Sequence, residues 1–365
     1  MKSKKKLFLM GLILLLIGLI LAILLIAGRT THKKDILVGF VTTGSIDEIG
    51  WNGIHYQAVQ KACDNLDVKL MIKENIKEFS GTCRGAVQEL IDEGASMIIL
   101  NSYGYAQEIY SLIARNPQVA FYLNASEGGG ENVTTYFVRM YQARYLAGIV
   151  AGKQTRSGQI GYVVAMNNSE VNRGIDAFTL GVRSVNPDAE VCVYWTGSWD
   201  DEAAEKEAVR KLVENKKIDV VTYHQNGPYV VEAAEEAGIY SIAYHQAYSD
   251  YSEKCLTAAV GNWDLVYTDL IRELVQGKGN NETNYWVGLE RSAVGLAPYS
   301  SAVSEETKEL VEQAIERISS GKDVFSGEIY DIDGVQRCAS GEMISDEVLL
   351  DRLDWFVEGV VFYEE

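Results

Sequence analysis

Apolar runs and amphipathic stretches alternate along the chain from residue 35 onward. The short apolar runs are typical of buried parallel strands, and the stretches between them have the spacing of helices that bury one face. The runs predict strands at 36–41, 69–73, 97–101, 120–123 and 135–138. The amphipathic stretches predict helices at 52–65, 83–93, 105–116 and 141–155. This series indicates a parallel sheet with helices on both faces.

The alternation begins again at residue 159, which predicts a second lobe of the same kind. Its strands are expected at 160–165, 190–195, 220–224 and 240–244, and its helices at 172–185, 201–215 and 227–237. After residue 244 the order changes. The pattern there predicts a strand at 257–260, a helix at 263–276, an apolar run at 287–299, and helices at 305–319 and 346–360.

This change of order predicts that the chain returns to the first lobe and then to the second. The fold class is therefore α/β, with two doubly wound parallel-sheet lobes joined at a hinge of three crossovers. Lobe 1 is expected to contain 35–142 with 247–281, and lobe 2 to contain 143–246 with 282–365. The cleft between hinged lobes is where we expect a ligand to bind.

The N-terminal residues 1–34 have the pattern of a membrane anchor followed by a short tether. Four lysines lie within residues 2–6, and the 22 residues from Leu7 to Gly28 carry no charge. That length spans a bilayer as a helix and exceeds the apolar region of about 7–15 residues in a signal peptide. The lysines should stay in the cytoplasm, which places the binding domain outside it. Cleavage near Ala27-Gly28 is left open.

Charge and cysteine content exclude some classes of protein. The net charge of −18 argues against nucleic-acid binding, which needs a basic surface. The five cysteines are widely spaced and form no zinc-binding pattern. Cys63 and Cys83 fall on neighbouring predicted helices, so a disulfide between them and two buried free thiols are both open.

The sequence carries none of the common catalytic motifs. It has no phosphate-binding loop, no zinc-protease helix, no serine-nucleophile elbow and no dinucleotide fingerprint. Its four histidines are too sparse for a metal site, and its acidic pairs lie where helices begin or on solvated helix faces. We therefore expect no enzymatic activity, no cofactor and no metal.

Aromatic, amide and imidazole side chains recur at the predicted strand ends, where ligands bind in open α/β sheets. These candidate ligand-binding residues are Trp51, Tyr103, Asn124, Trp199, His224, Asn226, His245 and Asn262. Aromatic rings stack on a flat heterocycle and amides read its edge, although a sugar also stacks on tryptophan. Each residue taken singly is more often structural. Trp51, for example, either stacks on a ligand or packs its loop onto the sheet.

Eight short segments carry a resemblance to a known family. They are GSIDEIGW at 44–51, SYGY at 102–105, RYLAGIVAGK at 144–153, AFTLGVRSVNP at 177–187, GSWD at 197–200, AAEEAG at 233–238, LAPY at 296–299 and GEIYDIDG at 327–334. Together they resemble the basic membrane protein family of ABC-transporter substrate-binding proteins, which includes purine nucleoside receptors. The resemblance extends from about Ile36 to Tyr363.

This resemblance implies a type I periplasmic-binding fold with a purine ligand. Two aromatic residues, one from each lobe, sandwich the base in the nucleoside-binding members, and Trp51 and Trp199 stand at those positions. An acidic residue and a lysine hold the ribose in the family, where this chain has His245 and Gly261. A free, adenine-like base therefore ranks first as the ligand, and a nucleoside second.

The resemblance also implies partners. The closed, ligand-loaded protein would dock on a membrane permease whose ATPase is a separate chain. Family members are usually lipoproteins, and the predicted membrane helix would replace the lipid anchor here. The alternatives are a membrane-anchored receptor for a signalling partner and a secreted nucleoside-cleaving enzyme.

Overall fold

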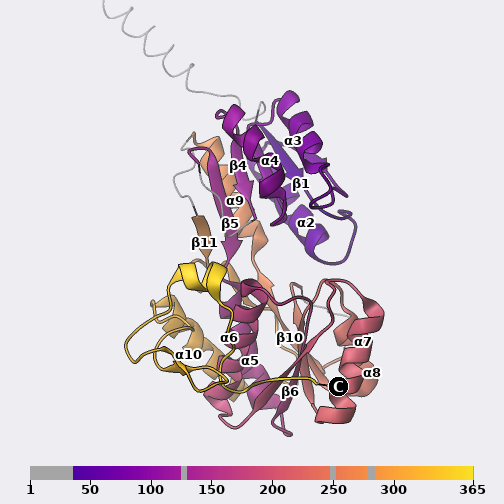
Figure 1. Cartoon of the computed structure of the whole chain (residues 1–365), viewed down its shortest axis with the longest axis vertical. Helices are drawn as coiled ribbons and strands as arrows, with labels where there is room; N and C mark the ends of the chain where they lie inside the picture. The colour runs from indigo at the N-terminus through magenta and orange to yellow at the C-terminus, as the bar shows by residue number, and fades with distance from the viewer. Residues whose placement is uncertain (1–35, 125–129, 247–251, 278–283, 365) are drawn as a thin grey trace, which may run out of the picture.

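The computed structural model describes residues 36–124, 130–246, 252–277 and 284–364, which form two α/β lobes (Figure 1). The sheet of lobe 1 has the strand order β11-β5-β4-β3-β1-β2, and all its neighbouring strands are parallel. Its strands are β1 (Leu37–Val41), β2 (Lys69–Lys73), β3 (Met97–Leu100), β4 (Ala120–Leu123), β5 (Val133–Val138) and β11 (Asn284–Val287). Five of these, β1 to β5, match the apolar runs from which they were predicted to within two residues at each end.

The sheet of lobe 2 has the order β12-β10-β9-β8-β6-β7-β15. Its strands are β6 (Gln159–Val164), β7 (Glu190–Trp195), β8 (Val220–His224), β9 (Tyr240–Tyr244), β10 (Cys255–Gly261), β12 (Val294–Leu296) and β15 (Val360–Phe362). The pairing is parallel except between β10 and β12. A separate antiparallel hairpin joins β13 (Ile329–Tyr330) and β14 (Gln336–Cys338).

Helices cover both faces of each sheet, as the sequence predicted. Lobe 1 has α2 (Trp51–Leu66) packed against α9 (Trp263–Val275), and α3 (Cys83–Asp92) packed against α4 (Tyr105–Arg115). These two helix pairs belong to separate buried apolar clusters. The helices of lobe 2 are α5 (Met140–Gln154), α6 (Ser169–Val185), α7 (Glu202–Lys211), α8 (Tyr229–Ala237) and α10 (Glu305–Ser319), with short turns η2 (Leu212–Lys216) and η3 (Leu289–Arg291).

Within the described residues the chain passes between the two sheets three times: after β5, after β10 and after β11. The positions of the second and third crossings correct the predicted lobe boundaries. Strand β10 pairs with β9 in lobe 2, although 247–281 was assigned to lobe 1. Strand β11 pairs with β5 in lobe 1, although 282–365 was assigned to lobe 2. An apolar run identifies a buried strand but does not identify its neighbour.

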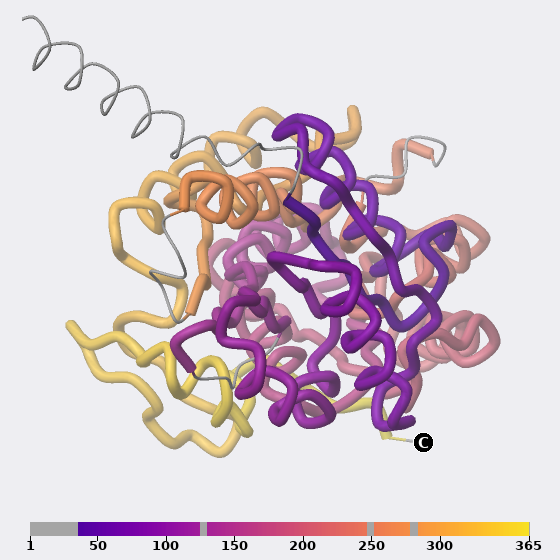
Figure 2. The backbone as a smooth tube through the Cα atoms, turned by 90° about the horizontal axis from the view of Figure 1, so that it is seen from above, coloured from indigo at the N-terminus to yellow at the C-terminus, as the bar shows by residue number. Residues whose placement is uncertain are grey.

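The predicted terminal helix at 346–360 was wrong. The segment forms one short turn, η4 (Val348–Arg352), and ends in the strand β15, which pairs with β7. Side chains of α6 take up its backbone groups: Arg173 donates to the carbonyl of Leu349, and Asn172 donates to that of Leu353. In a helix these carbonyls would accept hydrogen bonds from their own segment. In Figure 2 this yellow C-terminal region extends beyond lobe 1 on one side.

The predicted anchor, Leu7 to Gly28, lies outside the described residues. In the part of the chain that the structure describes, no helix is both long enough and apolar enough to cross a membrane. Cys63 and Cys83 are both free and buried, in different apolar clusters of lobe 1, so the structure supports the alternative of two buried thiols.

Candidate functional site

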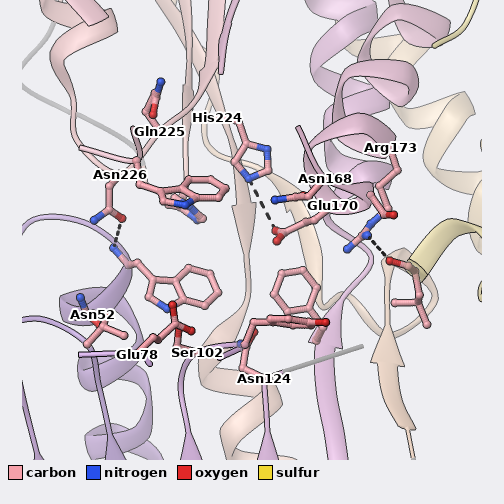
Figure 3. Close-up of a pocket in the computed structure, with 18 of the residues that line it drawn as sticks. Asn52, Glu78, Ser102, Asn124, Asn168, Glu170, Arg173, His224, Gln225 and Asn226 are labelled. Carbon is pink, nitrogen blue, oxygen red and sulfur yellow. Dashed lines mark hydrogen bonds and ion pairs between the residues drawn. The ribbon is translucent and has the colours of Figure 1, made fainter. Parts of the chain in front are cut away.

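A cavity of about 800 Å³ lies between the two lobes, within the size range of small-molecule sites. Lobe 1 lines it with Thr43, Trp51, Asn52, Lys77, Glu78, Phe79, Ser102, Tyr103, Asn124, Phe137 and Asn284. Lobe 2 lines it with Asn168, Ser169, Glu170, Arg173, Trp199, His224, Gln225, Asn226, His245, Leu350 and Asp351. Figure 3 shows Asn168 and Glu170 above this space and Asn124 below it.

Seven of the eight predicted ligand-binding residues line this cavity. They are Trp51, Tyr103, Asn124, Trp199, His224, Asn226 and His245. Their common position explains the result, because the carboxyl ends of parallel strands meet at one edge of a sheet. Those edges of the two lobes face each other across the cleft.

Asn262 is the exception, because its side chain caps the N-terminus of α9. Its side chain accepts a hydrogen bond from Leu265 N at 3.3 Å, which caps α9, and donates to the carbonyl of Ser292 at 3.3 Å. Asparagine is among the preferred N-cap residues, so a polar residue before a helix often has this structural role. Asn262 does not belong to the cavity lining.

Trp51 lines the cavity on the lobe 1 side, and contacts within lobe 1 fix its indole ring in place. Its indole N–H donates to the carbonyl of Asn101 at 2.9 Å, and its ring lies 3.9 Å from the His55 ring. The His245 ring of lobe 2 approaches it edge-on at 5.6 Å. Trp51 therefore packs its loop and also faces the cavity, so the two roles considered for it are compatible.

Trp199 lies on the lobe 2 side, in the loop between β7 and α7. It is 40% exposed, and its ring makes an edge contact with His224 at 5.8 Å between centroids. Its carbonyl accepts a hydrogen bond from Asn226 N at 2.9 Å. A ligand in the cavity could cover much of the exposed indole surface.

Asn226 connects the two lobes directly. Its side-chain oxygen accepts a hydrogen bond from the backbone N–H of Trp51 at 3.3 Å (Figure 3). Trp51 is the first residue of α2, whose initial N–H groups have no partner inside the helix. Gly50 permits this approach, because a side chain there would begin 2.7 Å from the Asn226 carbonyl and its φ of +144° is unfavourable for other residues.

The two histidines of the cavity are neutral at their positions in the lobe 2 wall. His224 Nε2 lies 3.0 Å from the Tyr244 hydroxyl. Burial lowers the pKa of His224 well below its ordinary value, and the positive charge of Arg144 adds to this effect. Burial and Arg144 also lower the pKa of His245, to about 3. Neither ring is therefore charged at neutral pH.

The first turn of α6 contributes a polar wall that the sequence analysis missed. Asn168 caps the helix by accepting from Val171 N at 3.0 Å, and Glu170 and Arg173 follow it. The helix was predicted to begin at residue 172, so Asn168 and Glu170 lay before it and Arg173 lay in its first turn. The rule that identified the other sites applies here too, since Asn168 follows the end of β6. Leu350 and Asp351, from η4, carried no such signal.

Burial raises the pKa of Glu170, and the nearby charges of Arg173 and Arg144 oppose this rise. The described residues contain no cluster of three or more histidine, cysteine or acidic side chains arranged to hold a metal ion. The cavity therefore offers two indole rings, several amides, neutral imidazoles and a few charges. This combination can bind a flat polar molecule.

Two parallel-sheet lobes with a cavity between them define a binding protein of the periplasmic-binding-protein class. The chain belongs to the Bmp family, described as ABC transporter substrate-binding protein PnrA-like, whose model matches residues 36–325. The family predicted from the eight sequence segments is thus confirmed, and the protein is a substrate-binding protein of an ABC transporter.

Three relatives illustrate the range of this similarity. A purine-binding protein of Brucella abortus is 28% identical, over 92% of this chain and 96% of its own length. A candidate ABC transporter glucose-binding protein of Haloferax volcanii is 29% identical, over 91% of this chain and 82% of its own. The crystal structure of a transcriptional activator of the comK gene from Bacillus halodurans is 25% identical, with a TM-score of 0.69, and covers 78% of this chain and 98% of its own.

Proposed function

We propose that this protein binds a purine base between Trp51 and Trp199 and delivers it to an ABC permease. The main observation in support of this proposal is that the two indole rings line one cavity from opposite lobes. A base has two aromatic faces and a polar edge, so it can stack on both rings while amides contact its edge. The purine-binding relative in Brucella abortus supports this choice of ligand.

A free base ranks above a nucleoside because the ribose-holding positions carry other residues. His245 is a neutral imidazole where an acidic side chain would accept hydroxyl groups. Gly261 stands in place of the lysine, and a side chain there would begin 2.9 Å from Trp263 Nε1. A nucleoside is the second candidate, because 800 Å³ leaves room for a sugar.

Transport requires that ligand binding favours the closed arrangement of the lobes. A ligand that contacts Trp51 and Trp199 together binds the closed form better than the open form, which shifts the population toward closure. The closed form would dock on a permease served by a separate ATPase chain. Residues 7–28 would anchor the protein, with residues 36–364 outside the cytoplasm. A signalling partner in place of the permease is the alternative for this arrangement.

Asn226→Ala should weaken adenine binding about fivefold, since it removes the hydrogen bond across the cleft, which contributes about 1 kcal/mol. Isothermal titration would measure this loss. Asn215→Ala is the control, because Asn215 is an exposed amide of lobe 2 that bonds to Tyr363. Equal affinities of the Asn226 variant and the unaltered protein would show that this contact does not favour closure.

Titration of the full chain in mild detergent tests the ligand directly. The protein should first be unfolded and refolded to remove any ligand carried through purification. We expect adenine or another free base to bind with a Kd of about 1 µM or tighter, and its nucleoside about tenfold more weakly. The panel is adenine, guanine, hypoxanthine, adenosine, guanosine and inosine, with glucose added because of the Haloferax volcanii relative.

Each result of this titration has a definite meaning. Tighter binding of nucleosides than of bases would reverse the ranking and assign a ribose-holding role to other residues. Binding of glucose with no purine bound would replace the purine by a sugar stacked on the same rings. Absence of binding by all the purines would overturn the proposed function.

A further inference from the structure

Glu170 lines the cavity with a carboxylate that has no role in the proposed stacking of a base between Trp51 and Trp199. It occupies the second position of α6, and 35% of its side chain is exposed. Figure 3 shows it extending from the lobe 2 wall, below His224. No hydrogen-bond donor reaches it from the described residues, and no lysine or arginine nitrogen among them lies within 4.0 Å of its oxygens.

The neighbouring groups do not satisfy this carboxylate. His224 Nε2 is 3.7 Å away, but that ring is neutral and the same nitrogen lies 3.0 Å from the Tyr244 hydroxyl. Arg173 lies one turn further along α6, and its hydrogen bonds to described residues run through Nη1 to the carbonyls of Leu349 and Leu350. Closure around a ligand would remove water from Glu170, and a carboxylate without donors is costly to bury. A ligand that supplies a donor would offset this cost.

The position of Glu170 indicates which part of the ligand supplies that donor. The Trp199 ring is 5.8 Å from the His224 ring, and His224 is 3.7 Å from Glu170. His224 thus neighbours both Trp199 and Glu170, and all three residues line the lobe 2 side of the cavity. At the edge of a stacked base an amino group or a ring N–H can donate to a carboxylate, whereas an unprotonated ring nitrogen or an oxo group is repelled. All four free bases compared below carry a ring N–H, so only the amino group distinguishes the members of each pair. Such a donor also favours the ionised form of the acid.

We propose that Glu170 is the specificity-determining acceptor for an amino group on the stacked ligand. The cavity would then select amino-substituted purines over purines that lack the amine. Asn124, on the opposite wall, cannot make this choice alone, because an amide both donates and accepts. The inference rests on the proposed function, since it presumes a purine between Trp51 and Trp199.

Two pairs of bases that differ by one amino group test this assignment. Adenine and unsubstituted purine form one pair, and guanine and hypoxanthine form the other. Titrations should use the full chain in detergent, with Glu170→Gln, Glu170→Met and the unaltered protein compared. We expect the unaltered protein to prefer the amino member of one pair by about tenfold or more. Both variants should reduce that preference to about threefold or less, because they remove the charge of the acceptor.

Glu306→Gln is the matched control. Glu306 is likewise the second residue of a lobe 2 helix, α10, but it is exposed, pairs with Lys153 and lies outside the cavity. Its variant should retain the preference, which separates an effect on the ligand from an effect on helix stability. Thermal unfolding of all variants would show that they remain folded.

Three outcomes would overturn the assignment. Equal weakening of both members of each pair by Glu170→Gln would show that the carboxylate shapes the cavity without reading the amine. A variant effect confined to the ratio of adenosine to 2′,3′-dideoxyadenosine would show that the donor is a ribose hydroxyl. Failure of the unaltered protein to bind any purine, whether base or nucleoside, would overturn the proposed function as well.

Discussion

Trp199→Ala is expected to weaken adenine binding by roughly tenfold to a hundredfold. Stacking of a base on an aromatic side chain contributes about 1–3 kcal/mol when measured by alanine substitution. Trp199 is 40% exposed, so its removal should cost little stability. The variant should therefore separate binding from folding better than Trp51→Ala, because the Trp51 indole is bonded to Asn101 inside lobe 1.

Two further variants make this result interpretable. Trp199→Phe keeps an aromatic face and should recover most of the affinity. Tyr330→Ala removes an aromatic residue of similar exposure, 42%, that does not line the cavity, and should leave the affinity unchanged. Isothermal titration with adenine measures all three. If Trp199→Ala bound adenine as tightly as the unaltered protein, the sandwich would be excluded.

Gly148→Ala is expected to destabilise lobe 2 severely. Helices α5 and α6 cross at this glycine, and an added Cβ would lie 2.1 Å from the carbonyl oxygen of Phe178. Gly181 is the facing glycine on α6, and a Cβ added to it would lie 2.1 Å from the carbonyl oxygen of Tyr145. Backbone atoms cannot move aside as a flexible side chain can, so the helices would have to separate. We expect a cost of about 3 kcal/mol or more, at the upper end for overpacked cores.

Gly85→Ala, in contrast, is expected to stabilise the protein. Gly85 lies inside α3, no atom lies within 4 Å of a Cβ added there, and its backbone is not left-handed. Alanine should stabilise that helix by about 0.5–1 kcal/mol, since glycine loses more backbone entropy on folding. Urea unfolding of both variants measures the difference. A Gly148→Ala protein as stable as the unaltered protein would show that the α5–α6 contact can relax.

Much of the fold could be predicted from the pattern of apolar residues. Strands buried on both faces consist of nearly continuous apolar residues, so β1, β3 and β8 were predicted to within one residue at each end. The same pattern placed Trp51, Trp199 and most of the other candidate residues at strand ends. The segments 144–153 and 177–187, which resembled the family most clearly, lie on α5 and α6 or directly after them, and these helices pack against each other.

Other features depended on contacts between distant parts of the chain. The 346–360 segment has the spacing of a helix, but it is helical only as far as η4, beyond which Asn172 of α6 binds the Leu353 carbonyl and the chain ends in β15. Asn262 follows a strand like the other candidates, yet its own helix uses its side chain as a cap. Glu170 gave no signal, because it lay before the helix predicted at 172–185, and only the structure extends that helix back to Ser169.

The sequence by itself therefore determined the local elements, the class of the fold and which strand ends carry aromatic and amide side chains. These depend on burial and on spacing along the chain, which a linear pattern records. Only the tertiary structure decided which sheet receives β10 and β11, which residues face the cavity, and that Asn226 joins the lobes across it. Those features are contacts between residues far apart in sequence, and such contacts form only when the two lobes pack.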